Sequence, residues 1–153
     1  MTDHRERRKL RHLLIIYDQS GKKTIPLEEA SYSLGRDPRN SIVLNASSVS
    51  RQHAMLLRIP GTELDQFIFR LIDGNLNGQH SRYGLAVNGQ LCTSRDLKSG
   101  DWIEFGGQVK AKYYAVYNLS DEDYDASSES NNLSAFFISR PNPVESLVDP
   151  KLV

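Results

Sequence analysis

Three short segments of the chain carry the side chains best suited to binding a charged ligand. In the first segment Gly35 precedes Arg36, and in the second Ser50 and Arg51 come shortly before His53. Arginine presents a planar fork of N–H donors that matches phosphate oxygens, and a serine hydroxyl donates a hydrogen bond without adding charge. Arg36, Ser50 and Arg51 therefore form a candidate binding site for a phosphate dianion.

The same residues do not indicate catalysis. Ser50 and His53 are three residues apart, and on an extended strand this spacing points their side chains to opposite faces. The sequence also lacks the G-x-x-x-x-G-K-[ST] loop that cradles nucleotide phosphates. We interpret His53 as a structural residue whose ring nitrogens tie neighbouring loops together, and we predict that the protein is not an enzyme.

One loop resembles the start of a calcium site, with Asp73, Asn75, Asn77 and Gly78 at the spacing of an EF-hand. The twelfth position is Gly84, however, where calcium coordination requires a bidentate glutamate. The histidines and the single cysteine show no zinc-ligand spacing either. We therefore expect neither a metal nor a cofactor.

Composition narrows the choice of partners. Nineteen basic residues balance nineteen acidic ones, so the basic excess typical of nucleic-acid binders is missing. The longest apolar runs, such as 13–17, are too short to span a bilayer. A lone cysteine, Cys92, allows no disulfide within the chain and fits a reducing compartment. We expect a soluble cytoplasmic protein that binds neither nucleic acid nor membrane, and its oligomeric state stays open.

Charge and apolar content divide the chain into three parts. Residues 1–11 are expected to be a basic, mobile N-terminus, and 12–118 the folded domain. Residues 119–153 are expected to be a disordered tail, because they are rich in serine and acidic residues and poor in apolar ones. Within that tail, 135–138 (AFFI) is a docking segment, a late strand or an isolated apolar patch.

Short apolar segments separated by turn signals predict an all-β domain. Asn88-Gly89 is the strongest hairpin signal, because both residues tolerate a positive φ, and Pro26 favours a sheet edge. Ten or so short strands with no convincing helix predict an antiparallel β-sandwich whose binding loops gather at one end. The main strands are expected at 12–17, 23–27, 31–35, 42–44, 53–59, 66–72, 101–105 and 108–117.

The order of the motifs resembles that of forkhead-associated (FHA) domains, which show G-R, then S-x-x-H, then S-x-N-G followed by V-N-G. The resemblance covers residues 12–118 and is closest to single-FHA proteins of bacterial and cyanobacterial type. It implies a sandwich of about eleven strands that recognises phosphothreonine through loops at one end. The matching segments here are Gly35-Arg36, Ser50-x-x-His53, Ser81-x-x-Gly84, Val87-Asn88-Gly89 and the later 100–106 (GDWIEFG).

The resemblance also implies roles for individual residues. Arg36, Ser50 and Arg51 correspond to the positions that contact phosphate. The positions that shape the loops correspond to Gly35, His53, Gly84, Asn88 and Gly89.

The third motif departs from the family pattern. Arg82 and Tyr83 stand where the family has threonine and asparagine, and that asparagine holds the main chain of the bound peptide. A tyrosine hydroxyl cannot replace an amide that both donates and accepts, whereas Arg82 would add a phosphate contact. The loop 74–80 is also longer than usual, and Asn75 or Asn77 could reach the peptide from it.

The function implied is recognition of phosphothreonine in a partner protein that is a substrate of a Ser/Thr kinase. The alternative is a degenerate FHA domain that acts as a scaffold independent of phosphorylation. The family prefers phosphothreonine to phosphoserine, and residues 119–153 contain serines but no threonine. The tail is therefore not the expected ligand of these loops.

Overall fold

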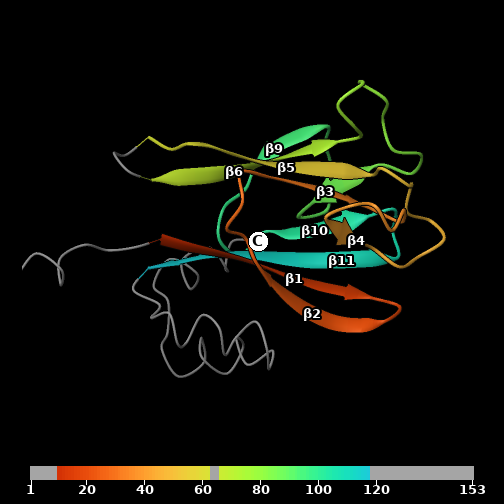
Figure 1. Ribbon diagram of the computed structural model, residues 1–153, viewed down its shortest axis with the longest axis horizontal. Coiled ribbons are helices and arrows are strands. Elements are labelled where there is room, and N and C mark those ends of the chain that lie inside the picture. Colours follow the sequence, from red (N-terminus) through yellow and green to blue (C-terminus); the bar gives the residue numbers. More distant parts are fainter. Residues whose placement is uncertain (1–9, 63–65, 118–153) are drawn as a thin grey trace, which may run out of the picture.

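Two stacked β-sheets make up the fold (Figure 1). The computed structural model describes residues 10–62 and 66–117. The expectations for the two chain ends lie almost entirely outside these residues, although strand β1 already begins at Leu10, two residues before the predicted start of the domain. Eleven strands form the fold: β1 (Leu10–Asp18), β2 (Gly21–Pro26), β3 (Ser31–Gly35), β4 (Ile42–Val43), β5 (Ala54–Pro60), β6 (Phe67–Asp73), β7 (Leu85–Val87), β8 (Gln90–Leu91), β9 (Ser94–Asp96), β10 (Trp102–Phe105) and β11 (Val109–Tyr117).

The six-stranded sheet has the order β2-β1-β11-β10-β7-β8, and the five-stranded sheet has the order β4-β3-β5-β6-β9. The predicted edge position of Pro26 is confirmed, because β2 is the outermost strand of its sheet. Strand pairing is antiparallel with one exception among the described strands: β3 and β4 run parallel, with Leu34 opposite Ile42. The β-sandwich expected from the sequence is thus confirmed, with this one parallel pair added.

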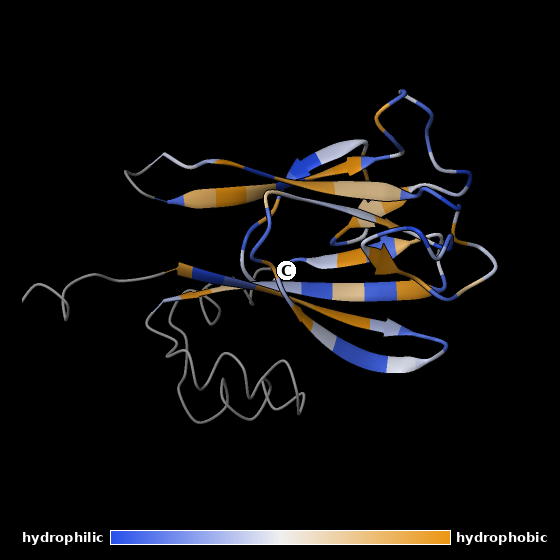
Figure 2. Cartoon of the chain, viewed as in Figure 1, coloured by the Kyte–Doolittle hydropathy of each residue, from blue (hydrophilic) through white to orange (hydrophobic). Residues whose placement is uncertain are grey.

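The core lies between the sheets and follows the two-residue period of the strands. On β11, Val109, Ala111 and Tyr113 are buried, while Lys110 and Lys112 alternate with them on the other face, as the colours of Figure 2 show. Each large apolar side chain buried in this way contributes about 1.5–3 kcal/mol. The largest fully buried aromatic side chains are those of Tyr113, Phe69 and Phe105.

The longest loops lie together at one end of the sandwich, on the right in Figure 1. They connect β3 to β5 by way of β4, and β6 to β7. The predicted hairpin between β5 and β6 is present, with Pro60 opposite Phe67. No helix of a length and apolarity that would cross a membrane occurs in residues 10–62 and 66–117.

Candidate functional site

The first loop of the site, residues 36–53, folds back onto the end of β3. A Cβ atom added to Gly35 would lie 2.1 Å from the carbonyl oxygen of Arg51, so only glycine permits this approach. The backbone N–H of Arg36 donates to the carbonyl of Ser50 at 3.0 Å, and that of His53 donates to the carbonyl of Leu34 at 2.8 Å. The loop is therefore closed at both ends by main-chain bonds.

The fully buried His53 ring holds two loops together. Its Nδ1 accepts a hydrogen bond from the backbone N–H of Ser50 at 3.0 Å, so Nε2 carries the proton that is donated to the carbonyl of Gly84 at 2.7 Å. Burial lowers the pKa of His53, opposed by the Gly84 carbonyl and the charge of Asp73. Burial is the largest of these effects, so the net lowering of the pKa favours a neutral ring that serves as a structural bridge.

The geometry predicted for Ser50 and His53 was wrong in one respect. The two residues lie in a turn before β5 rather than on an extended strand, so the His53 ring does reach Ser50. It contacts the main-chain N–H of Ser50, however, and not the hydroxyl. The contact therefore orders the loop and does not form a serine–histidine couple for nucleophilic attack.

The hydroxyl of Ser50 faces the third loop. Its Oγ accepts a hydrogen bond from the backbone N–H of Arg82 at 2.9 Å. A hydroxyl that accepts one bond keeps its own hydrogen for donation. Ser50 is therefore held in place by one partner while its O–H remains able to bind an anion.

Next to this hydroxyl lies a hollow of about 230 Å³ that contains three arginines and no carboxylate. Nε of Arg36 donates to the carbonyl of Val49 at 2.9 Å, which fixes the guanidinium and leaves its two terminal amino groups for a ligand. An anion placed in the hollow would meet a net positive charge. The lining residues are Arg36, Ser47, Ser48, Val49, Ser50, Arg51, Arg82 and Tyr83.

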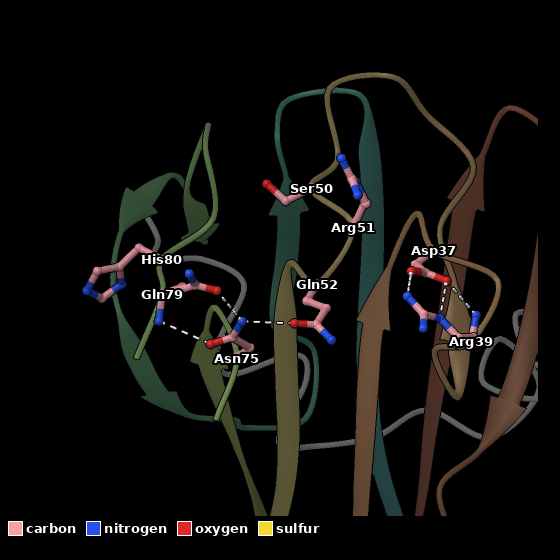
Figure 3. A pocket seen from close by; sticks show the side chains of 8 residues that line it. All are labelled: Asp37, Arg39, Ser50, Arg51, Gln52, Asn75, Gln79 and His80. Atoms are coloured by element: carbon pink, nitrogen blue, oxygen red, sulfur yellow. Dashed lines mark hydrogen bonds and ion pairs between the residues drawn. The ribbon is translucent and has the colours of Figure 1, made fainter. Parts of the chain in front are cut away.

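A second hollow of about 470 Å³ adjoins the first, with Ser50 and Arg51 lining both (Figure 3). On one side, Arg39 forms an ion pair with Asp37 at 2.7 Å, and the Arg39 hydrogen bonds lower the pKa of Asp37 to about 2. No hydrogen bond or ion pair joins the Arg51 side chain to the other residues drawn. The two hollows therefore meet at Ser50 and Arg51.

The predicted role of Asn75 in binding a peptide conflicts with its local bonds. Its Oδ1 accepts from the backbone N–H groups of Asn77 and Gln79, at 2.9 and 3.1 Å. Its Nδ2 donates to the side chains of Gln52 and Gln79, at 2.8 and 2.9 Å (Figure 3). The whole amide is thus used to shape the loop. Asn77 is exposed and lines a different hollow, beside Leu76, so its role in binding stays a prediction.

Tyr83 lies at the rim of the arginine hollow. Its side chain is 58% exposed, and the Arg82 guanidinium stands 5.3 Å from the centre of its ring.

The residues predicted to shape the loops have positive backbone angles. Gly84 has a φ of +89°, and the hairpin residues Asn88 and Gly89 have φ of 53° and 82°. These positive angles explain why glycine and asparagine occur here.

The sequence did not reveal the structural roles of Asp73, Ser81 and Gln52 in the site. The buried carboxylate of Asp73 accepts hydrogen bonds from the hydroxyl and the N–H of Ser81, and His80 contacts it at 3.1 Å. Ser81 in turn accepts from the N–H of Gly84 at 3.0 Å. Gln52 braces Asn75, as described above. Asp73 resembled a calcium ligand in the sequence, but in the fold it binds its own loop, and the described residues contain no group of three or more potential metal ligands.

Comparison with known proteins agrees with this arrangement. The sequence model of the FHA domain matches residues 32–106, which include every loop of the site. The chain belongs to the FHA domain family. The crystal structure of the Slr1951 protein from Synechocystis sp. is 39% identical, covers 67% of this chain and 96% of its own, and superposes with a TM-score of 0.64. The recognition of an FHA domain from its sequence motifs is thereby confirmed.

Two further FHA structures are 28% identical. One comes from work on phosphothreonine-dependent FHA domain interactions (TM-score 0.54; 68% of this chain and 95% of that one). The other is the FhaA FHA domain complexed with the intracellular domain of Rv3910 (TM-score 0.53; 67% and 98%). An uncharacterized Synechocystis protein, sll1895, is 38% identical over 103 residues, which are 67% of this chain but 15% of that protein. FHA domains are binding modules, and this chain has their fold.

Proposed function

We propose that this FHA domain binds phosphothreonine-containing segments of partner proteins, with the phosphate in the hollow formed by Arg36, Ser50, Arg51 and Arg82. The observation that carries the proposal is the position of Ser50. Its hydroxyl oxygen is fixed by the Arg82 N–H, while its hydrogen is free to donate into a hollow lined by three arginines.

The charges in the hollow suit a phosphate better than a carboxylate. A phosphorylated side chain carries a charge of about −1.5 to −2 and three acceptor oxygens at neutral pH. Hydrogen bonds to charged groups contribute about 1.5–3 kcal/mol each. Arg36, Arg51 and Arg82 are all exposed, so water screens their charges and their bonds belong at the lower end of this range; Arg36 differs in that its Nε is anchored to the Val49 carbonyl.

Relatives support this proposal. An FHA domain that is 28% identical was studied for interactions that depend on phosphothreonine, and another was crystallised with the intracellular domain of a second protein. For this chain we propose a partner phosphorylated on threonine by a Ser/Thr kinase. Tyr83 would contact the peptide from the rim of the hollow, and Asn77, in its exposed loop, would do so beyond the second hollow.

Calorimetry with three matched peptides tests the proposal: one with phosphothreonine, one with phosphoserine and one with plain threonine, chosen from an oriented peptide library. We expect binding of the phosphothreonine peptide and a loss of at least about tenfold in Arg36→Ala, since one charge-assisted hydrogen bond is worth that factor. Arg95→Ala, which removes an arginine from β9 outside both hollows, is the matched control.

The competing function is a scaffold that ignores phosphorylation. Equal affinity for the phosphorylated and plain peptides would contradict our proposal and favour the scaffold. The same distinction can be made with natural partners, because a scaffold would retain them after phosphatase treatment, whereas a phosphothreonine reader would release them.

A further inference from the structure

Strand β1 buries side chains on both of its faces. Leu14 and Ile16 point into the main core between the sheets. Leu13 and Ile15 alternate with them, so they point away from the second sheet, yet they are 0% and 1% exposed. Because the second sheet lies on the opposite side, it cannot cover them. Together with Tyr114 they form a small apolar cluster on the outer face of the six-stranded sheet, against which Tyr17 and Val116 pack.

Further residues of this outer face follow from the strand register. Directly opposite residues in antiparallel strands share a face, which places Tyr114 beside Leu13, and Lys112 beside Ile15. Tyr114 is 8% exposed and belongs to the same apolar cluster. Trp102 stands opposite Lys112, so it is on this face as well. The outer face is thus apolar at its centre and aromatic toward β10.

Aromatic and cationic groups on this face contact one another. The rings of Tyr17 and Trp102 are 5.8 Å apart. Nζ of Lys112 lies 5.2 Å from the ring centre of Trp102 and 5.4 Å from that of Tyr114. Beside them, a hollow of about 370 Å³ is lined by Tyr17, Gln19, Trp102, Gln108, Lys110 and Asp18, whose carboxylate accepts hydrogen bonds from Ser20 and Asn45. Such a surface is suited to an occupant that carries both aromatic side chains and negative charge.

The outer face carries more positive than negative charge. The register places four cations on it, against the single carboxylate of Glu104 among the described residues of these strands. The four cations are Arg11, Lys22, Lys110 and Lys112. A second copy of the same face would bring like charges together, and a nucleic-acid backbone would not supply apolar cover for Leu13 and Ile15. The complement is an acidic peptide segment with large apolar side chains.

We propose that the outer face of the six-stranded sheet is the docking surface for the chain's own C-terminal segment, residues 118–153. This segment contains seven acidic residues against two basic ones, and the apolar run 135–138 follows the acidic run 121–129. The acidic run would face the lysines, and Phe136 and Phe137 would cover the apolar centre and reach the hollow beside Trp102. The docking does not depend on phosphopeptide binding by the loops.

The chain is long enough for this return. β11 ends at Tyr117, opposite Leu10, at the far end of the sandwich from the binding loops. From there to Lys110 is about 23 Å along the strand, at roughly 3.3 Å per residue. Residues 118–138 can span up to about 70 Å when extended. The segment therefore reaches the whole face without approaching the loops of the proposed phosphate site.

Trp102 provides a direct test, because it is the only tryptophan of the chain and lies on this face. In the full-length protein, the double variant Phe136→Ser, Phe137→Ser should shift the emission of Trp102 to longer wavelength and raise its acrylamide quenching constant at least about twofold, as burial against apolar side chains is lost. The matched control Asn131→Ser, Asn132→Ser should leave both unchanged. Unchanged emission and quenching in the phenylalanine variant would overturn the proposal.

A spin label distinguishes the chain's own segment from a second copy. With Cys92→Ser, a nitroxide on Ser134→Cys should broaden the amide signals of Leu13, Ile15 and Tyr114, and leave those of the loop around Leu76 sharp. The broadening should persist on tenfold dilution and when excess unlabelled protein is added. Broadening that disappears on dilution would indicate a dimer, and broadening absent from β1 and β11 would indicate no docking; either result contradicts the proposal.

Discussion

The hydroxyl oxygen of Ser50 and the backbone N–H of Arg82 are 2.9 Å apart, and this hydrogen bond joins the first and third loops of the site. Beneath it, the buried ring of His53 joins the same two loops a second time, from the N–H of Ser50 to the carbonyl of Gly84. The two bridges place the hydroxyl of Ser50 at the border of the arginine hollow. The hydroxyl that we propose as a phosphate donor is therefore held in place by bonds within the protein.

Replacing Ser50 by alanine should remove both the phosphate donor and the bond to Arg82. We expect affinity for a phosphothreonine peptide to fall by at least about tenfold, which corresponds to the free energy of one hydrogen bond to a charged group. Ser47→Ala is a matched control, because Ser47 lines the same hollow but its hydroxyl makes only a long 3.5 Å contact with Gln108. Calorimetry that shows equal losses in the two variants would argue against a specific role for Ser50.

Gly35→Ala should displace the loop that carries Ser50 and Arg51. The added methyl group would lie 2.1 Å from the Arg51 carbonyl oxygen, so the loop that carries Arg51 must move. Overpacking of this kind destabilises by about 1–3 kcal/mol. We expect urea denaturation to show a loss in this range together with weaker phosphopeptide binding. Ser31→Ala, at the exposed start of β3, should affect neither by a comparable amount. An unchanged stability of Gly35→Ala would contradict the packing argument.

The sequence predicted the sandwich because its strands carry clear signals. The buried strands alternate apolar and polar residues or are wholly apolar, and Asn88-Gly89 marks its hairpin. Strand β9 (Ser94–Asp96) was missed, because its residues are Ser, Arg and Asp and show no apolar period. It exists because its backbone pairs with β6, where Arg70 also forms an ion pair with Asp96 at 2.6 Å. Pairing of this kind depends on a distant strand and leaves no local pattern.

In the site, too, some features could be predicted from the sequence and others could not. Arg36, Ser50 and His53 could be identified from their motifs, since the family fixes their types and order. The bonds that position them could not, because they join residues far apart in sequence, as in the link from Asp73 to Ser81. Asn75 was expected to face the ligand, but an exposed asparagine can equally satisfy its own loop, and only the fold shows that it does so.

Acid should destabilise the fold partly through His12. The Tyr113 hydroxyl donates to Nδ1 of this buried ring at 2.5 Å, and burial, aided by the charge of Arg58, lowers the pKa of His12 from 6.5 to about 4. Between about pH 6.5 and pH 4, His12 is therefore protonated in the unfolded chain but neutral in the folded protein. The resulting stability is complete above about pH 6.5 and is lost as the pH falls toward about 4, up to about 3 kcal/mol.

Urea denaturation of wild type and His12→Gln at pH 7, 6, 5 and 4.5 measures this effect. Glutamine retains an acceptor for the Tyr113 hydroxyl but cannot be protonated in this range. Its unfolding free energy should therefore fall less steeply with acid than that of wild type, although His53 contributes in the same direction in both proteins. Identical slopes for wild type and His12→Gln would refute the assignment.

We expect Tyr83 to influence how the main chain of a bound peptide is held. Its exposed ring contacts the Arg82 guanidinium, and its hydroxyl has one atom for both roles, whereas an amide donates and accepts from two separate atoms. We expect Tyr83→Asn to bind phosphothreonine peptides more tightly, by about threefold to tenfold, the gain of one net hydrogen bond. Tyr83→Phe separates the hydroxyl from the ring, and an unchanged affinity in this variant would mean that the hydroxyl is not used. Weaker binding by Tyr83→Asn, in calorimetry and in an oriented phosphopeptide library, would contradict this prediction. It would mean that the tyrosine ring itself contacts the ligand and that the asparagine amide does not compensate for the loss of the ring.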